Sequence, residues 1–155
     1  MSTFIGNIDA KIDDKGRIFI PATYRRLLPE NESKHIVMRR DTDNECLVLY
    51  PEHVWNAKVT ELKEALDEWN PEDQLLLMQF MSDAQWLDID SQGRVLLDKR
   101  NLQSIGAEKE LVFVGMMDRF ALWDKKKFSE RRLPQADFAA RLKNRMLDRQ
   151  KPTNQ

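Results

Sequence analysis

Cysteine is nearly absent from this chain of 155 residues, which holds Cys46 as its single example. One cysteine cannot close an internal disulfide or supply the paired thiolates of a zinc site, and it is typical of a reducing compartment. We interpret Cys46, in the segment ECLVLY, as a small strand residue. The two histidines, His35 and His53, lie at no ligand-like spacing from Cys46 or from each other. We therefore expect no metal site and no cofactor.

Long apolar runs and targeting signals are also missing. The run LLLM at 75–78 is far too short to cross a bilayer, and the N-terminus lacks a basic segment followed by an apolar one. We expect a cytoplasmic protein that does not bind membranes.

The sequence contains no phosphate-binding glycine loop and no cluster of nucleophile and base. The acidic pairs Asp13/Asp14 and Asp88/Asp90 lie in predicted hairpin turns, where aspartate is common for conformational reasons. An enzymatic function, and with it a small-molecule substrate, is therefore not expected.

Charge is balanced overall but unevenly distributed. The net charge is −1, yet residues 124–155 carry 10 Lys/Arg against 4 Asp/Glu. Residues 9–40 carry 8 against 5 within an otherwise acidic body. Such asymmetry can concentrate positive potential on one face of a nearly neutral protein. A polyanionic partner is compatible with this pattern, as are basic helices that serve solubility.

A short motif occurs twice. Residues 13–21 read DDKGRIFIP and residues 90–97 read DSQGRVLL, an acid-x-x-Gly-Arg turn followed by an apolar strand, 77 positions apart. Each copy predicts a β-hairpin, because the acid can bond the local backbone and the glycine tolerates positive φ.

The elements around the two motifs follow the same order of strand, turn, strand, short helix and two strands. This order indicates an internal duplication whose loops differ slightly in length. The first copy comprises strands at 4–13, 17–20, 35–40 and 46–51 with a helix at 22–28, and the second comprises strands at 84–90, 94–97, 110–116 and 119–124 with a helix at 98–106.

Helical patterns follow each copy. Residues 51–70 place apolar residues at spacings of three and four, and Pro71 begins another helix. Residues 124–149 form the corresponding segment after the second copy, with a break at Leu133-Pro134. The four tryptophans lie on apolar faces, so we interpret them as core or interface residues: Trp55, Trp69, Trp86 and Trp123.

Each Asp-x-x-x-Arg motif allows two compatible interpretations. The acid and the arginine can pair across the hairpin and hold the turn. An arginine held in this way keeps donors for a phosphate or a guanine edge. Arg25 and Arg26, on the predicted helix at 22–28, could simply be a solvated face. They also complete a dense cluster of five cations, whose mutual repulsion a polyanion would relieve. The cluster consists of Lys11, Lys15, Arg17, Arg25 and Arg26.

These residues resemble a known family. Lys11-x-Asp13-x-x-Gly16-Arg17-Ile18-x-Ile20-Pro21 followed by Tyr24-Arg25-Arg26-Leu27 resembles the SpoVT/AbrB swapped-hairpin DNA-binding domain. The tandem arrangement, the length and the paired motifs resemble the MraZ family of bacterial transcriptional regulators of the division and cell-wall gene cluster. The resemblance covers nearly the whole chain.

The resemblance implies a mixed α+β fold in which two tandem units form one β-barrel, with short helices and a longer helix after each unit. It also implies ring-shaped homo-oligomers that bind repeated short boxes of double-stranded promoter DNA, usually to repress, including at the protein's own promoter. We accordingly expect a nucleoid-associated protein with DNA-binding residues Lys11, Lys15, Arg17, Arg25, Arg26 and Arg94, and turn residues Asp13, Gly16, Asp90 and Gly93. The units expected are 4–55 and 83–128, with connecting helices at 56–82 and a basic helix and tail at 129–155.

The second copy departs from the pattern. Asp98 replaces Pro21, and Leu102 and Gln103 replace Arg25 and Arg26. We therefore expect the first copy to read DNA, while the second completes the barrel and contributes to subunit contacts. The alternative from another class is an antitoxin-type module that uses the same fold to bind a protein.

Overall fold

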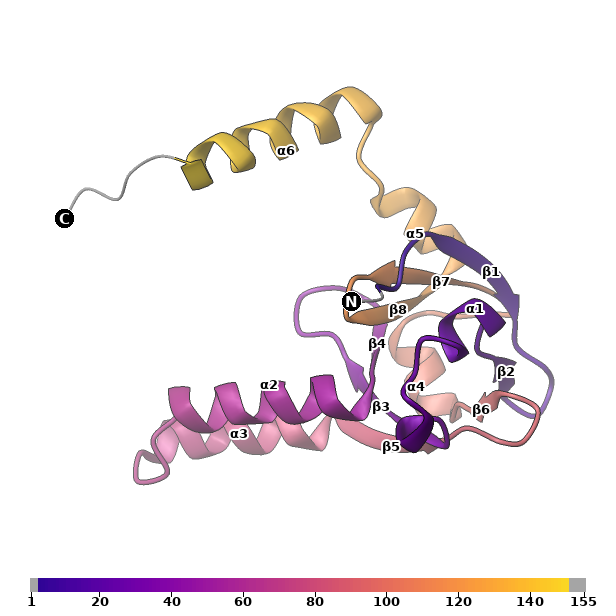
Figure 1. Ribbon diagram of the computed structural model, residues 1–155, viewed down its shortest axis with the longest axis horizontal. Coiled ribbons are helices and arrows are strands. Elements are labelled where there is room, and N and C mark those ends of the chain that lie inside the picture. The colour runs from indigo at the N-terminus through magenta and orange to yellow at the C-terminus, as the bar shows by residue number, and fades with distance from the viewer. Residues whose placement is uncertain (1–2, 151–155) are drawn as a thin grey trace. The chain divides into compact units, whose positions relative to one another are not determined.

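The computed structural model describes residues 3–150, and their mixed α+β architecture confirms the predicted fold class (Figure 1). The chain divides into two compact units, one ending at Lys125 and the other beginning at Lys126. No helix in the described range is long and apolar enough to traverse a bilayer.

The first copy of the repeat forms the predicted elements in the predicted order. The six-residue strand at the HIVMRR segment agrees with the prediction to the residue, whereas the first strand is shorter than expected. The elements are β1 (Asn7–Lys11), β2 (Arg17–Phe19), α1 (Ala22–Arg25), the 3-10 turn η1 (Glu30–Glu32), β3 (His35–Arg40) and β4 (Leu47–Tyr50).

The second copy has the same order of strands and helix. Asp98 caps its helix, because the Asp98 carboxylate accepts a hydrogen bond from the Asn101 backbone N–H at 2.8 Å. The elements are β5 (Ala84–Asp88), β6 (Arg94–Leu96), α4 (Lys99–Ser104), β7 (Glu110–Met116) and β8 (Arg119–Asp124).

Strands of the two copies interleave. A six-stranded antiparallel sheet has the order β1-β7-β8-β4-β3-β5, and β2 pairs with β6 in a separate two-stranded sheet. Thus β1 of the first copy pairs with β7 of the second, and β5 of the second pairs with β3 of the first. The strands form these two sheets rather than one continuous closed barrel, so the barrel in our expectation is not seen as such.

The strands that flank each turn pair with strands of the other copy and not with each other, so each predicted β-hairpin is a strand–turn–strand segment whose pairing is exchanged between the copies. Two equivalent hydrogen bonds connect these two hairpin segments. The Ile20 N–H donates to the Gly93 carbonyl at 3.0 Å, and the Leu97 N–H donates to the Gly16 carbonyl at 2.8 Å. Ile20 and Leu97 are themselves buried, one from each copy. The main core draws on both copies, and it includes Phe4, Tyr24 and Phe120, whose rings contact one another.

A helical hairpin joins the two copies. It consists of α2 (Glu52–Ala65) and α3 (Pro71–Ser82), which lie side by side in Figure 1. The predicted helix at 51–70 ends earlier than expected, because Leu66 is extended and the Asp67 N–H bonds the Asp73 carboxylate at 2.8 Å. Asn70 then caps α3 by accepting from the backbone N–H of Glu72 and Asp73.

The second unit is helical. The predicted break at Leu133-Pro134 is confirmed, since α5 (Lys125–Arg131) ends before it and α6 (Gln135–Gln150) begins after it. Phe138, Leu142, Met146 and Leu147 of α6 are each about half exposed. Within the described residues, α6 therefore presents an apolar stripe to its surroundings.

Candidate nucleic-acid interface

The two Gly-Arg turns have the same hydrogen bonds. In the first, the Asp13 Oδ1 accepts from the backbone N–H of Lys15 and Arg17, and its Oδ2 accepts from the Arg17 Nε at 2.8 Å. In the second, Asp90 accepts in the same way from Gln92 and Arg94, with its ion pair at 2.9 Å. The ion pair predicted for each turn is therefore confirmed.

Both acids are held ionised by the turn. The Arg17 backbone N–H is the largest cause of a lowered pKa at Asp13, and the Arg94 backbone N–H has the same effect on the pKa of Asp90. Hydrogen bonds to the charged carboxylate favour that form. Because each acid fixes its arginine through Nε, the guanidinium has a defined direction before any ligand arrives.

The outward face of β2 and β6, which we call the β2–β6 face, carries Arg17, Phe19, Arg94 and Leu96. Arg17 lies opposite Leu96 and Phe19 lies opposite Arg94, so all four side chains share one side of the two-stranded sheet. Ile18 and Val95, at the intervening positions, are buried on the other side. Arg94 also lies over the ring of Phe19, at 5.8 Å from its centroid.

Phe19 and Leu96 are more than half exposed, so the β2–β6 face combines cations with accessible apolar groups. Sequence reasoning missed these two residues as parts of the site. Their signal was available, because each is the outward position of a three-residue strand between two buried neighbours. Sequence alone did not show that the two strands pair with each other.

Arg25 connects the first copy to the turn of the second. Its Nε donates to the Ile20 carbonyl at 3.1 Å, and its guanidinium lies so close to Gly93 that a Cβ there would be 2.5 Å from Cζ. Gly93 also has a φ of +86°, which disfavours side chains. Of the two interpretations of Arg25, the one that places it on a solvated helix face does not hold, since the residue is half-buried.

The orientation of α1 follows from Tyr24. Its ring is buried, and its hydroxyl donates to the carbonyls of Ile5 at 3.0 Å and Gly6 at 3.2 Å. Burial of this residue raises the pKa of its hydroxyl, which stays a neutral donor at ordinary pH. With Tyr24 directed inward, Arg26 is exposed.

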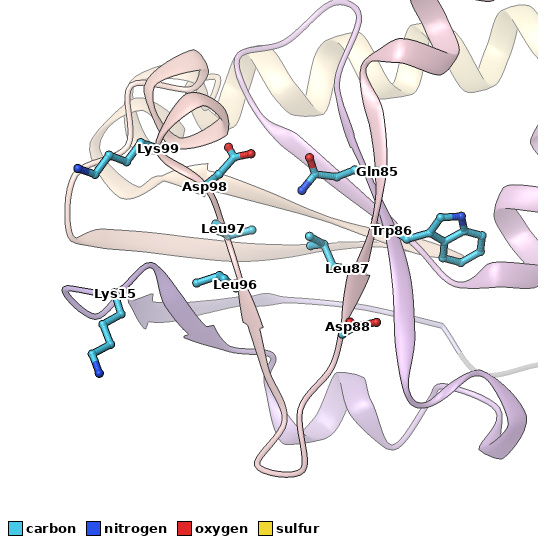
Figure 2. Close-up of a pocket in the computed structure, with 9 residues that line it drawn as sticks. All are labelled: Lys15, Gln85, Trp86, Leu87, Asp88, Leu96, Leu97, Asp98 and Lys99. Atoms are coloured by element: carbon cyan, nitrogen blue, oxygen red, sulfur yellow. The ribbon is translucent and has the colours of Figure 1, made fainter.

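Lys15 and Lys11 are exposed neighbours of the first turn. Lys11 ends β1 opposite Glu110 of β7. Lys15 lines a groove of about 450 Å³ between β5 and β6, which Lys99 of the second copy also lines. Figure 2 shows Lys15 and Lys99 on the β6 side, Leu87 directed into the groove, and Trp86 directed away on the other side of β5.

The structure thus unites Arg17, Arg94, Lys15 and Arg25 around the paired hairpins, while Lys11 and Arg26 lie on the adjoining β1 and α1. Lys99, which was not among the expected DNA-binding residues, joins them at the groove. Of the tryptophans, Trp55 and Trp123 are buried as core residues, whereas Trp69 and Trp86 are exposed.

Comparison with known proteins gives a consistent result. A family described as the MraZ protein, antitoxin-like, matches residues 3–77 and 80–149. A protein named transcriptional regulator MraZ from Bacteroides fragilis is 40% identical over 154 residues, covering 99% of this chain and 98% of that protein. Proteins of the same name from Bacteroides thetaiotaomicron (38%, covering 96% and 95%) and Chlorobaculum parvum (31%, covering 95% and 94%) are also similar.

Proposed function

The chain belongs to the MraZ family, and from that premise we propose that it regulates transcription by binding double-stranded DNA through the β2–β6 face and its adjoining cations. One observation carries this proposal. Arg17 and Arg94 lie on the same exposed face, each held at Nε by an aspartate of its own turn.

The chemistry of this face suits DNA. A guanidinium has five N–H donors, so an arginine bound to an acid through Nε still offers a planar fork to a phosphate or a guanine edge. Aspartate neutralises part of the charge but also fixes the direction of the fork. Phe19 and Leu96 add apolar surface of the kind that contacts thymine methyl groups.

The two hairpins contribute unequally in this proposal. Lys11, Lys15, Arg25 and Arg26 all belong to the first copy. The matching positions of the second copy hold Asp88, Gln92, Leu102 and Gln103. We assign the dominant DNA contacts to the first copy and a supporting contact to Arg94. The two copies correspond to units 4–55 and 83–128, arranged as tandem swapped hairpins that complete one barrel-like body, with connecting helices at 56–82 and a basic helix and tail at 129–155.

The wider regulatory role also belongs to the proposal. One subunit supplies only a few phosphate contacts, which give weak binding at physiological salt. A ring-shaped homo-oligomer on repeated boxes would multiply affinity through effective concentration. We propose repression of the division and cell-wall gene cluster, including the protein's own promoter, by a cytoplasmic protein associated with the nucleoid.

A protein-binding role of the antitoxin type is the second candidate, and the family description favours it by its wording. The groove between β5 and β6, with exposed Leu96 at its edge, is a surface to which a peptide could bind. The two functions differ in their sensitivity to salt, because binding through phosphates releases counterions.

A direct test measures binding of the full-length protein to its own promoter fragment at several salt concentrations. We expect retarded complexes whose log K falls linearly with log salt, and weaker binding by the Arg17→Ala variant. Binding that neither depends on salt nor responds to Arg17→Ala would contradict the proposal. Binding to random DNA of equal length measures the part of the affinity that does not depend on sequence.

A further inference from the structure

The helical hairpin of α2 and α3 carries an apolar groove that its own helices leave open. The groove has a volume of about 490 Å³, and most of its lining is aliphatic. The lining includes Val59, Leu62 and Leu66 of α2 and its C-cap, and Leu77 and Met81 of α3. An open apolar groove between two helices can receive the apolar stripe of a third helix.

The α6 helix has a stripe of that kind. Phe138, Leu142 and Met146 are four residues apart, so they lie along one side of the helix. Arg141 and Arg145 flank the stripe at the neighbouring helical positions. Exposed apolar residues in such an arrangement mark an interaction surface rather than a solvated helix.

Charge complements shape here. Residues 52–82, which contain the hairpin, carry seven Asp/Glu against two Lys, whereas α6 carries four Lys/Arg against two Asp/Glu. Glu68 and Lys63 both line the groove, so the excess negative charge lies around the groove rather than in its lining. Opposite charges around an apolar contact steer the two surfaces together and fix their register.

We propose that α6 of one subunit binds in the α2–α3 groove of a second copy of this chain. Since every copy carries one groove and one α6, contacts can continue from subunit to subunit and close into a ring. The inference specifies the contact surface of the homo-oligomer in the proposed function and rests on that proposal.

A second copy of this chain supplies a partner of matching chemistry, because each chain carries one apolar groove in an acidic helical hairpin and one apolar stripe on a basic helix. Binding within one chain is the outcome that the crosslink described below distinguishes.

Two pairs of variants of the full-length protein test the contact. Leu142→Glu places a charge in the α6 stripe, and Asn144→Glu places the same charge on the opposite side of the helix. Met81→Lys changes the groove, and Met78→Lys changes an outward position of α3 that is more exposed. Light scattering should show that Leu142→Glu and Met81→Lys lower the mass by at least twofold, while the two controls keep the wild-type mass. If the Leu142→Glu and Met81→Lys variants both keep the wild-type mass, the proposal is overturned.

A crosslink distinguishes the second copy from the same chain. The double variant Met81→Cys/Met146→Cys is treated with a short bis-maleimide, and Cys46 does not compete because burial raises the pKa of its thiol to about 12. A ladder of dimers and larger species on a denaturing gel is expected. Crosslinking confined to the monomer band would overturn the proposal in favour of docking within one chain.

The DNA-binding proposal can fail separately. The Arg17→Ala variant should keep the wild-type mass, and the Leu142→Glu variant should bind a fragment with one box as the wild type does while losing its preference for several boxes. Loss of DNA binding with an intact oligomer concerns the β2–β6 face alone. An unchanged preference for several boxes in Leu142→Glu would count against the α6 contact.

Discussion

The guanidinium of Arg25 lies directly against Gly93, the glycine of the turn in the other copy. The matching glycine, Gly16, lies instead against the backbone carbonyl of Leu97, which a Cβ would approach to 2.5 Å. Equivalent positions in the duplication therefore face a movable side chain in one case and fixed backbone in the other.

This difference predicts unequal effects of alanine at the two glycines. Both have positive φ, so each alanine costs about 1–2 kcal/mol of unfolding free energy from conformation alone. Gly16→Ala should cost more, because the Leu97 carbonyl is backbone directly after β6, where the Leu97 N–H is bonded to the Gly16 carbonyl. Gly93→Ala should displace Arg25 and weaken DNA binding as well. Urea denaturation measures the stability of the two variants, and promoter binding measures their affinity for DNA. Equal destabilisation by the two alanines would contradict the prediction.

Alanine at Arg25 should lower both the stability of the fold and the affinity for DNA, whereas alanine at Arg26 should lower the affinity alone. Arg25→Ala removes the hydrogen bond to the Ile20 carbonyl and should cost about 1 kcal/mol of unfolding free energy together with affinity. Arg26→Ala changes an exposed residue and should reduce affinity at unchanged stability. Thermal melts measure the stability of the Arg25→Ala and Arg26→Ala variants, and gel shifts measure their affinity for DNA. A stable Arg25→Ala variant would show that this contact does not support the fold.

The arginines of the two turns should differ in their salt dependence. Arg17→Ala should cost about 1–3 kcal/mol of binding free energy and reduce the slope of log K against log salt by about one. Arg94→Ala should lose less affinity, since Gln92, Leu102 and Gln103 bring no further cations to its hairpin. Equal losses from the two changes would mean that both hairpins contact DNA alike.

Acid should loosen both turns. The pKa values of Asp13 and Asp90 are lowered in the folded chain from about 3.8, so their contribution to stability is full above that pH. It is lost as pH falls below 3.8 through the folded pKa values. The double variant Asp13→Asn/Asp90→Asn should therefore melt lower than wild type at pH 6, with the difference shrinking toward pH 2. A constant difference across this range would contradict the assignment.

Much of the architecture could be read from short patterns. The Asp-x-x-Gly-Arg turns, the strand HIVMRR and the break before Pro134 all depend on local chemistry, and the structure reproduces them. The sequence did not reveal which strands pair with each other, because strand pairing depends on contacts between residues far apart in sequence. The pairing of β2 with β6 is an example, and with it the common face of Arg17 and Arg94.

Arg25 shows a second limit. Its position on a short helix beside another arginine is typical of a solvated, basic face. Its half-buried state depends on the turn of the other copy, 68 positions later, which places Gly93 against it. Polarity patterns within one helix contain no information about such a neighbour. The outward positions of Phe19 and Leu96 follow from alternation along each strand, but their common face depends on the pairing of β2 with β6 of the other copy.

The exchange of strands between copies has a consequence for synthesis. β1 begins at Asn7 and pairs with β7, whose first residue is Glu110, so the partner leaves the ribosome about 5–20 s after β1 at about 5–20 residues per second. During that interval β1 and β2 have unpaired edges, which are sites of association with other chains. Neighbouring nascent copies on one messenger could pair their first hairpins with each other. Such pairing would produce strand-exchanged dimers instead of folded single chains.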